Sequence, residues 1–158
     1  MLLPLVALVL GAALWWWSHP RAFAEAGGGA IVPGEPGRPT LVVLTFATDG
    51  PRVTLVDARP RVVSDDTGAT VTVHACHRPD SRDWVGAGPD VDEICAELRD
   101  PQGPLAALDQ LVLEVVPQGP GRVVVDGVDV SYRTGLQQGT QWTGIDVIVE
   151  VGDGEVAW

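Results

Sequence analysis

The chain contains no lysine. Its ten basic residues are all arginine, they stand against 21 Asp and Glu residues, and the formal net charge is −11. A protein that binds DNA or RNA needs a positively charged surface to neutralise phosphates, and docking flat on anionic lipid needs clustered cations. The composition therefore excludes nucleic acid as a partner, and it argues against charge-driven docking on a membrane.

The local motifs of common enzyme classes are also missing. The sequence has no G-x-S-x-G, no P-loop and no dinucleotide fingerprint, and Ser131 has no histidine or carboxylate at a recognisable spacing that could activate it. The aspartates between residues 80 and 92 lack the spacing of an EF-hand, which favours a solvated acidic loop over a calcium site. We therefore expect a protein that is not an enzyme and carries no cofactor.

An uncharged apolar run, LLPLVALVLGAALWWW, occupies residues 2–17. It is short of the roughly 20 residues that cross a bilayer squarely but close to the lower limit of the range. Its tryptophans favour the membrane interface. We predict that residues 1–19 form a transmembrane anchor and place a single-pass protein in the cell membrane with its domain on the extracytoplasmic side. Because Ala22-Phe23-Ala24 has a small-x-small pattern, the alternative is a signal peptide and a domain secreted after cleavage near Ala24.

The remainder divides into a linker and a β-rich domain. Residues 20–39 are rich in Gly and Pro and are predicted to be a linker, so that the folded domain covers residues 40–158. Within the domain, apolar residues recur with a period of two, most clearly over 145–151. Further runs predict strands at 41–46, 52–56, 71–75 and 111–115.

The stretch RVVVDGVDVSY, residues 122–132, changes the phase of its alternation at Asp126-Gly127. We interpret the change as a bulge within one long strand in preference to a hairpin, since the flanking pieces are short. About seven short strands with frequent turns predict an all-β fold, an antiparallel sandwich of immunoglobulin or fibronectin type. Residues 131–144 are predicted to be a polar, glycine-containing loop.

One short helix is expected after Asp90. Glu93 follows Asp90 at the spacing of a capping box, and Asp100-Pro101 would end the helix. The apolar residues Val91, Ile94, Cys95 and Leu98 would share one of its faces.

The only two cysteines, Cys76 and Cys95, are predicted to form a disulfide, because an exported chain meets an oxidising environment in which two thiols pair. The alternative is a metal site that uses His74 and His77 with the cysteines. On one strand, however, His74 and His77 point to opposite faces. The second half of a structural zinc motif is missing as well, so we expect no metal.

The stretch GRVVVDGVDVSYRTGLQQGTQWTG, residues 121–144, resembles the final strands of uncharacterised membrane-anchored extracytoplasmic β-sandwich proteins of actinobacteria. The resemblance covers about a sixth of the chain and carries no active residue. It implies a location outside the cytoplasm and nothing catalytic.

These observations favour a non-enzymatic, membrane-tethered interaction domain that supports a membrane or envelope complex through an unidentified protein partner. Trp84 and Trp142 are the candidate contact residues, since aromatic side chains anchor many interfaces; the alternative for Trp84 is that it folds back to cover the disulfide. The alternative is an exported domain that binds a small ligand or a metal through His74 and His77.

Overall fold

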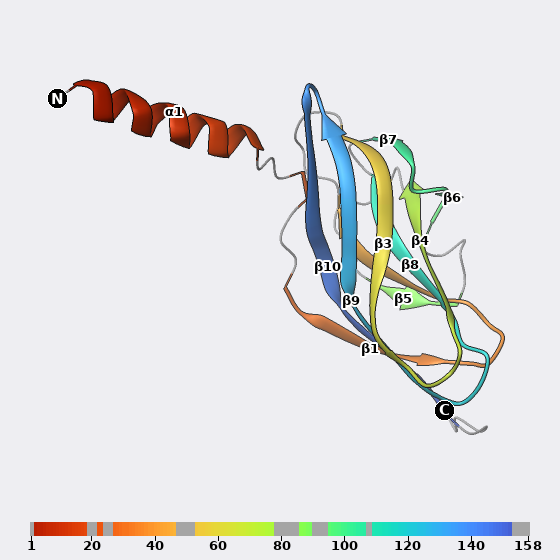
Figure 1. Cartoon of the computed structure of the whole chain (residues 1–158). Coiled ribbons are helices and arrows are strands. Elements are labelled where there is room, and N and C mark those ends of the chain that lie inside the picture. The colour runs from red at the N-terminus through yellow and green to blue at the C-terminus, as the bar shows by residue number, and fades with distance from the viewer. Residues whose placement is uncertain are drawn as a thin grey trace.

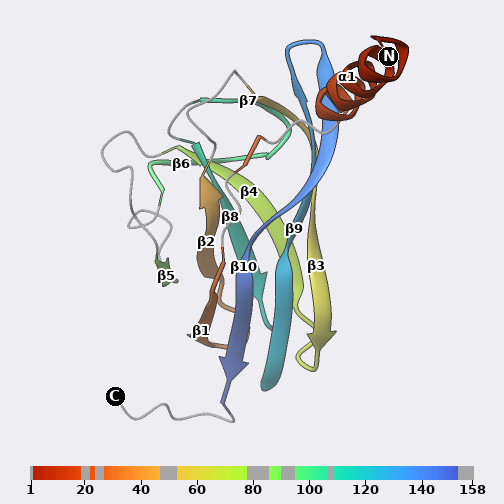
Figure 2. The same ribbon diagram turned by 90° about the vertical axis from the view of Figure 1, so that its left-hand side faces the viewer.

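The computed structural model describes residues 2–18, 22–23, 27–46, 53–77, 86–89, 95–106 and 109–152. It consists of helix α1 (Leu2–Ser18) and two five-stranded sheets that face each other (Figures 1 and 2). Trp84, and residues 90–94 of the expected helix, lie outside the described residues. Among the residues that are described, no helix combines the length and apolarity that crossing a membrane requires.

The structure is mostly β, as predicted, and its two sheets are largely antiparallel. Sheet I has the strand order β1-β10-β9-β3-β7, and sheet II has the order β5-β2-β8-β4-β6. Of the strand pairs formed by the described residues, β1–β10 is parallel and the others are antiparallel. The strands are β1 (Gly29–Gly34), β2 (Thr40–Phe46), β3 (Val53–Asp65), β4 (Thr70–His77), β5 (Ala87–Gly88), β6 (Glu97–Arg99), β7 (Gly103–Leu105), β8 (Asp109–Val116), β9 (Gly121–Thr134) and β10 (Gln137–Val151).

The core lies between the sheets and consists of the inward side chains of each strand. Because successive side chains of a strand point to opposite faces, every second residue reaches this core. In β10 the buried row is Val147, Val149 and Val151, which confirms the strand predicted there. Burial of such rows is the main favourable contribution to the folding free energy of the sandwich.

The predicted bulge at Asp126-Gly127 is confirmed, and β9 is one continuous strand. Pro60 and Val62 of β3 pair with Val128 and Val125, so a single β3 residue lies opposite both Asp126 and Gly127. Gly127 has a φ of +61°, and a Cβ there would lie 2.6 Å from the carbonyl oxygen of Thr143. Glycine is needed at this position on both counts.

The prediction that residues 20–39 are a linker is wrong. Residues 29–34 form β1 and pair in parallel with β10, while Ala22 and Phe23 belong to the core, with 3% and 2% exposure. Gly and Pro suit this strand because it lies at a sheet edge, where Pro33 needs no second partner. The folded part therefore begins well before Thr40.

Two further expectations need correction. The segment 134–144 is not a loop, because β9 and β10 form a long hairpin whose turn is Gly135 and Leu136. Gly135 has a φ of +59°, as a two-residue hairpin turn requires, and the polar side chains around it lie on an exposed ribbon. The predicted helix does not reach Leu98, since Leu98 lies in β6 and pairs with Cys76 of β4. Pairing at the sheet edge prevails over the local helical pattern there.

Candidate functional site

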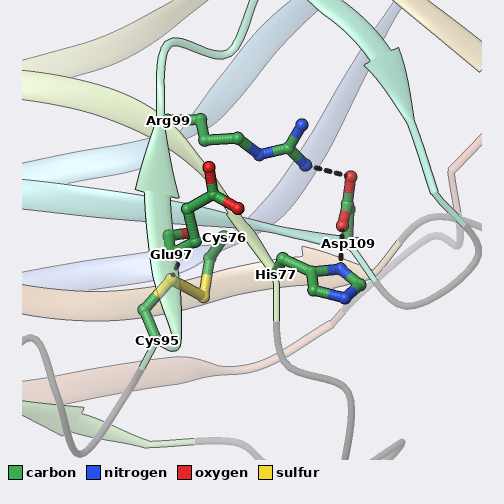
Figure 3. The surroundings of a disulfide bond; sticks show 6 residues. All are labelled: Cys76, His77, Cys95, Glu97, Arg99 and Asp109. Atoms are coloured by element: carbon green, nitrogen blue, oxygen red, sulfur yellow. Dashed lines mark hydrogen bonds and ion pairs between the residues drawn. A yellow bond between two sulfur atoms is a disulfide. The ribbon is translucent and has the colours of Figure 1, made fainter.

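The predicted disulfide is present and joins Cys76, near the end of β4, to Cys95, just before β6 (Figure 3). Both residues are buried, with 0% and 2% exposure. They belong to a second, smaller apolar cluster, separate from the main core, that also contains Leu41, Val43 and Val112, with Leu98 packed against it. Since both sulfurs are bonded, neither can serve as a catalytic thiol or a metal ligand.

The two candidate metal ligands, His74 and His77, point to opposite faces of β4, as the alternation predicts. The Nε2 atom of His74 lies 2.7 Å from a carboxylate oxygen of Glu114, and the Nδ1 atom of His77 lies 2.7 Å from a carboxylate oxygen of Asp109. The two imidazoles therefore do not converge. Across the described ranges, no group of three or more His, Cys, Asp or Glu residues is placed to hold a metal ion.

Asp109 is the centre of a polar cluster that also contains His77 and Arg99 (Figure 3). Its fully buried carboxylate accepts hydrogen bonds from the Arg99 guanidinium at 2.5 Å and the Ala106 backbone N–H at 2.8 Å, in addition to its contact with His77. A buried charge is tolerated when it is paired in this way. The cluster ties β4, β6 and the start of β8 together.

A histidine that is oriented by a buried aspartate could act as a general base. Such a base requires a nucleophile within hydrogen-bonding reach. In the part of the chain that the structure describes, no hydroxyl or thiol group is bonded to His77. The contacts that the structure does show link His77, Arg99 and the Ala106 backbone to Asp109.

Trp142 lies within β10, where it supports the bulge. Its indole N–H donates a 2.9 Å hydrogen bond to the carbonyl oxygen of Asp126, and its ring covers Gly127. The side chain is partly buried, so much of its surface is already in contact with the protein itself. Only part of the ring is left for a binding partner.

The feature that sequence analysis missed is the junction between α1 and the sandwich. The backbone N–H groups of Ala22 and Phe23 both donate to Oε1 of Gln141, at 3.1 and 3.3 Å, and Nε2 of Gln141 donates to the carbonyl oxygen of Phe23 at 2.9 Å. The Phe23 ring meets Tyr132 edge to face, with ring centroids 5.8 Å apart. We call these four residues the junction clamp.

The burial of Tyr132 in the junction clamp has an electrostatic consequence. Burial raises the pKa of the Tyr132 phenol above its usual value, because the phenolate would lose its hydration. A hydrogen bond with the backbone of Ala22 offsets part of this rise in pKa. No local pattern in the sequence signals the clamp, because its two halves are more than a hundred residues apart.

Helix α1 leaves the sandwich beside the β9–β10 hairpin (Figure 1). Nε2 of Gln137 donates a 2.8 Å hydrogen bond to the carbonyl oxygen of Trp17 in the last turn of the helix. The large apolar side chains that the structure describes in the helix are all exposed. They are Val6, Leu8, Val9, Leu10, Leu14, Trp15 and Trp17, with exposed fractions from 49% to 74%.

The outward face of sheet I, which faces the viewer in Figure 1, carries a short apolar row. Ile31, Ile148 and Val124 are register partners across β1, β10 and β9, and Ile31 is 68% exposed. Further along the same face, Arg61 forms ion pairs with Asp129 at 2.7 Å and Asp126 at 3.4 Å. This face thus offers a mixed apolar and charged surface.

A hollow of about 260 Å³ lies between the edges of the two sheets, beside β1 and β5. Among the described residues of its wall, the charged ones are Glu35 and Arg38, which form an ion pair with each other at 2.7 Å. The rest of the wall is mainly apolar or glycine, including Val32, Pro39 and Pro89. The described part of the wall thus presents an internally paired charge and a mainly apolar surface.

Comparison with models of known protein families finds no match, and a search of curated proteins finds no match either. Any functional assignment must therefore rest on the geometry of this chain. Its most distinctive features are an apolar helix with exposed sides, the clamp that joins the helix to the sandwich, and a disulfide.

Proposed function

We propose that this protein is a non-enzymatic, membrane-tethered interaction domain on the extracytoplasmic side of the cell membrane, where it supports a membrane or envelope complex. Helix α1 is the tether and the sandwich is the interaction domain. The observation that carries the proposal is the exposed apolar surface of α1 together with its clamped connection to the sandwich.

Lipid is the environment that suits α1. A helix that is apolar on all sides is normally buried, because exposing its side chains to water costs about 25 cal/mol for each Å². Seven large apolar side chains of α1 are about half exposed or more. Trp15 and Trp17, at the end of the helix nearer the domain, fit the bilayer interface. A helix of 17 residues is about 26 Å long, which approaches the roughly 30 Å of the hydrocarbon layer.

The junction clamp supports a retained helix over a cleaved signal peptide. Cleavage near Ala24 would remove Phe23 from the core and leave Tyr132 and Gln141 without the partners that they have in this structure. Opening a cavity of aromatic size in a core costs about 3 to 5 kcal/mol. A secreted form that begins after Ala24 would therefore be the less stable protein.

Two observations support the extracytoplasmic side. A disulfide such as Cys76–Cys95 is typical of proteins in an oxidising compartment and rare in the cytosol. The resemblance of residues 121–144 to membrane-anchored extracytoplasmic proteins implies the same location. The finer classification as an immunoglobulin- or fibronectin-like sandwich belongs to this proposal, and the two packed, largely antiparallel sheets support it.

The face of sheet I that carries Ile31 is the part of the described surface that we assign to the partner, together with Trp84 and the exposed portion of Trp142. An exposed apolar row with charged neighbours is a common composition for a protein interface. The alternative function, binding of a small ligand or metal through His74 and His77, has less support, because each imidazole already contacts a carboxylate on its own face of β4.

Cell fractionation tests the tether. The full chain should sediment with membranes, resist extraction at high pH, and have the mass of the uncleaved sequence. A reporter enzyme that is active only outside the cytoplasm should be active when fused to the C-terminus. A soluble chain that starts near Glu25, or a reporter active only in the cytoplasm, would contradict the proposal.

In vivo photo-crosslinking tests the interaction surface. A photoreactive amino acid at Ile31 should give a discrete protein adduct in intact cells. The same amino acid at the exposed Gln118, in the β8–β9 connection, is the matched control and should give none. Equal adducts at both positions, or none at Ile31, would count against a partner on this face.

A further inference from the structure

We infer that the turn of the β9–β10 hairpin is a second membrane contact, in which Leu136 enters the interfacial layer of the lipid bilayer beside the end of α1. The inference rests on the proposed function, since it requires α1 to be embedded in the bilayer. It goes further by assigning a lipid-binding role to a part of the folded domain.

The position of Leu136 is the first argument. Its side chain is 94% exposed, the largest fraction among the large apolar side chains of the described residues. Its neighbour Gln137 is hydrogen-bonded to the carbonyl oxygen of Trp17. The turn is therefore tied to the last turn of the helix, in which Trp15 and Trp17 are 63% and 54% exposed, and the two turns lie at the same end of the sandwich (Figure 1). When these indoles lie in the interfacial layer of the bilayer, the side chain of Leu136 lies close to the same layer.

The distribution of charge is the second argument. The chain has 21 acidic residues, yet none lies in residues 2–24 or in residues 130–145, the two segments that meet at this end of the molecule. Carboxylates are repelled by lipid phosphates and are costly to dehydrate. The one charged side chain in this part of the hairpin is Arg133, which is exposed and could extend its guanidinium towards phosphate groups. Such segregation is expected of a surface that faces lipid.

The junction clamp allows the contact of Leu136 with lipid to form even though its binding free energy is small. Complete transfer of one leucine side chain from water is worth only about 1.5 to 3 kcal/mol, too little to hold a free protein on a membrane. In this chain α1 already holds the turn at the surface, so the second contact is intramolecular and has a high effective concentration. The contact would restrict rotation of the sandwich about the axis of α1, and would thereby fix which face is presented to a partner.

Quenching by spin-labelled lipid tests the inference on the full chain in nanodiscs of phosphatidylcholine with phosphatidylglycerol. Both native cysteines are in the disulfide, so an introduced cysteine is the only free thiol and can carry an environment-sensitive fluorophore. The label goes on Gln138→Cys, an exposed site beside the turn, so that Leu136 stays native. The comparison labels are Leu14→Cys in α1 and Gln118→Cys at the far end of β9, about 45 Å away along the strand.

We expect lipids that are spin-labelled near the headgroup to quench the label at position 138 several-fold more than the label at position 118. Adding Leu136→Asp should remove most of this quenching and leave that of the Leu14→Cys label unchanged. Quenching at 14 but not at 138, or quenching at 138 that Leu136→Asp does not reduce, would overturn the inference while leaving the tether intact. Lack of quenching at 14 would overturn the tether itself, and the inference with it.

Discussion

The side-chain amide of Gln141 binds the backbone of Phe23 at both of its polar groups, since Oε1 accepts from the Phe23 N–H at 3.3 Å and Nε2 donates to the Phe23 carbonyl at 2.9 Å. A neighbouring strand would satisfy the same two groups with its own backbone. The side chain of Gln141 thus supplies to the segment that follows α1 the two hydrogen bonds that a neighbouring strand would supply. This relationship fixes the segment at Ala22 and Phe23 to the sandwich.

The first prediction concerns this clamp. Gln141→Ala should lower the free energy of unfolding by about 2 kcal/mol, because three hydrogen bonds, each worth about 0.5 to 1.5 kcal/mol net, are lost. Gln138→Ala, a substitution of the same type at an exposed site on the same strand, should change it by less than about 0.5 kcal/mol. Chemical denaturation of the full chain in detergent measures both. Equal effects of the two substitutions would argue against the clamp.

The second prediction concerns the chain's single tyrosine, Tyr132, whose phenol can be titrated alone by ultraviolet absorbance. Its pKa should exceed the usual value of about 10, because burial disfavours the phenolate. The unfolded chain then ionises first, so the contribution of Tyr132 to stability is complete below about pH 10 and declines as the pH rises through the higher pKa of the folded state. Phe23→Ala should move the pKa back towards 10, and a pKa that this substitution leaves unchanged would show that Phe23 does not shield the phenol.

The third prediction concerns the bulge. Gly127→Ala combines an unfavourable positive φ with a Cβ only 2.6 Å from the backbone oxygen of Thr143. Gly37→Ala has a similarly positive φ of +75° but no heavy atom within 4 Å of the new Cβ. We expect a loss of about 1 kcal/mol for Gly37→Ala from backbone strain, and a further 1 to 3 kcal/mol or so for Gly127→Ala from the steric clash. Thermal denaturation compares them, and equal melting temperatures would disprove the close packing of Trp142 and Thr143 on Gly127.

The fourth prediction concerns the disulfide. Replacing both Cys76 and Cys95 by Ala should lower the free energy of unfolding by about 3 kcal/mol, as expected for a bridge with a sequence separation of 19. Reductant should destabilise the natural protein by a similar amount and leave the double variant unchanged. A natural protein whose stability does not respond to reductant would show that the bridge contributes little.

Local alternation was sufficient to predict much of the sandwich. The strand at residues 145–151 was found because its apolar residues recur with a period of two, and the strand at 41–46 was found because a short apolar run ends at a turn signal. The phase change at Asp126-Gly127 located the bulge by the same reasoning. The opposite orientations of His74 and His77 followed from strand geometry alone, and they are what separates the two imidazoles in the structure.

Other elements depend on partners that are distant in the chain. β1 lacks a clear alternation, and it is a strand because β10 supplies its hydrogen bonds. β6 follows a helical pattern up to Leu98, yet it pairs with the edge of β4. Short segments of this kind have weak preferences of their own, so tertiary pairing decides their conformation. The polar segment 134–144 likewise became a hairpin because its two halves pair with each other.

The sequence by itself determined the apolar character of α1, the β-rich nature of the domain and the pairing of its two cysteines, because each depends on local pattern or on residue count. Only the tertiary structure decided that residues 22 and 23 belong to the core and that Leu136 lies beside the end of the helix. Gln141 and Phe23 are 118 positions apart, and no local pattern encodes a contact over such a separation. Their contact exists because the folded sheet brings the edge of β10 to the segment that follows α1.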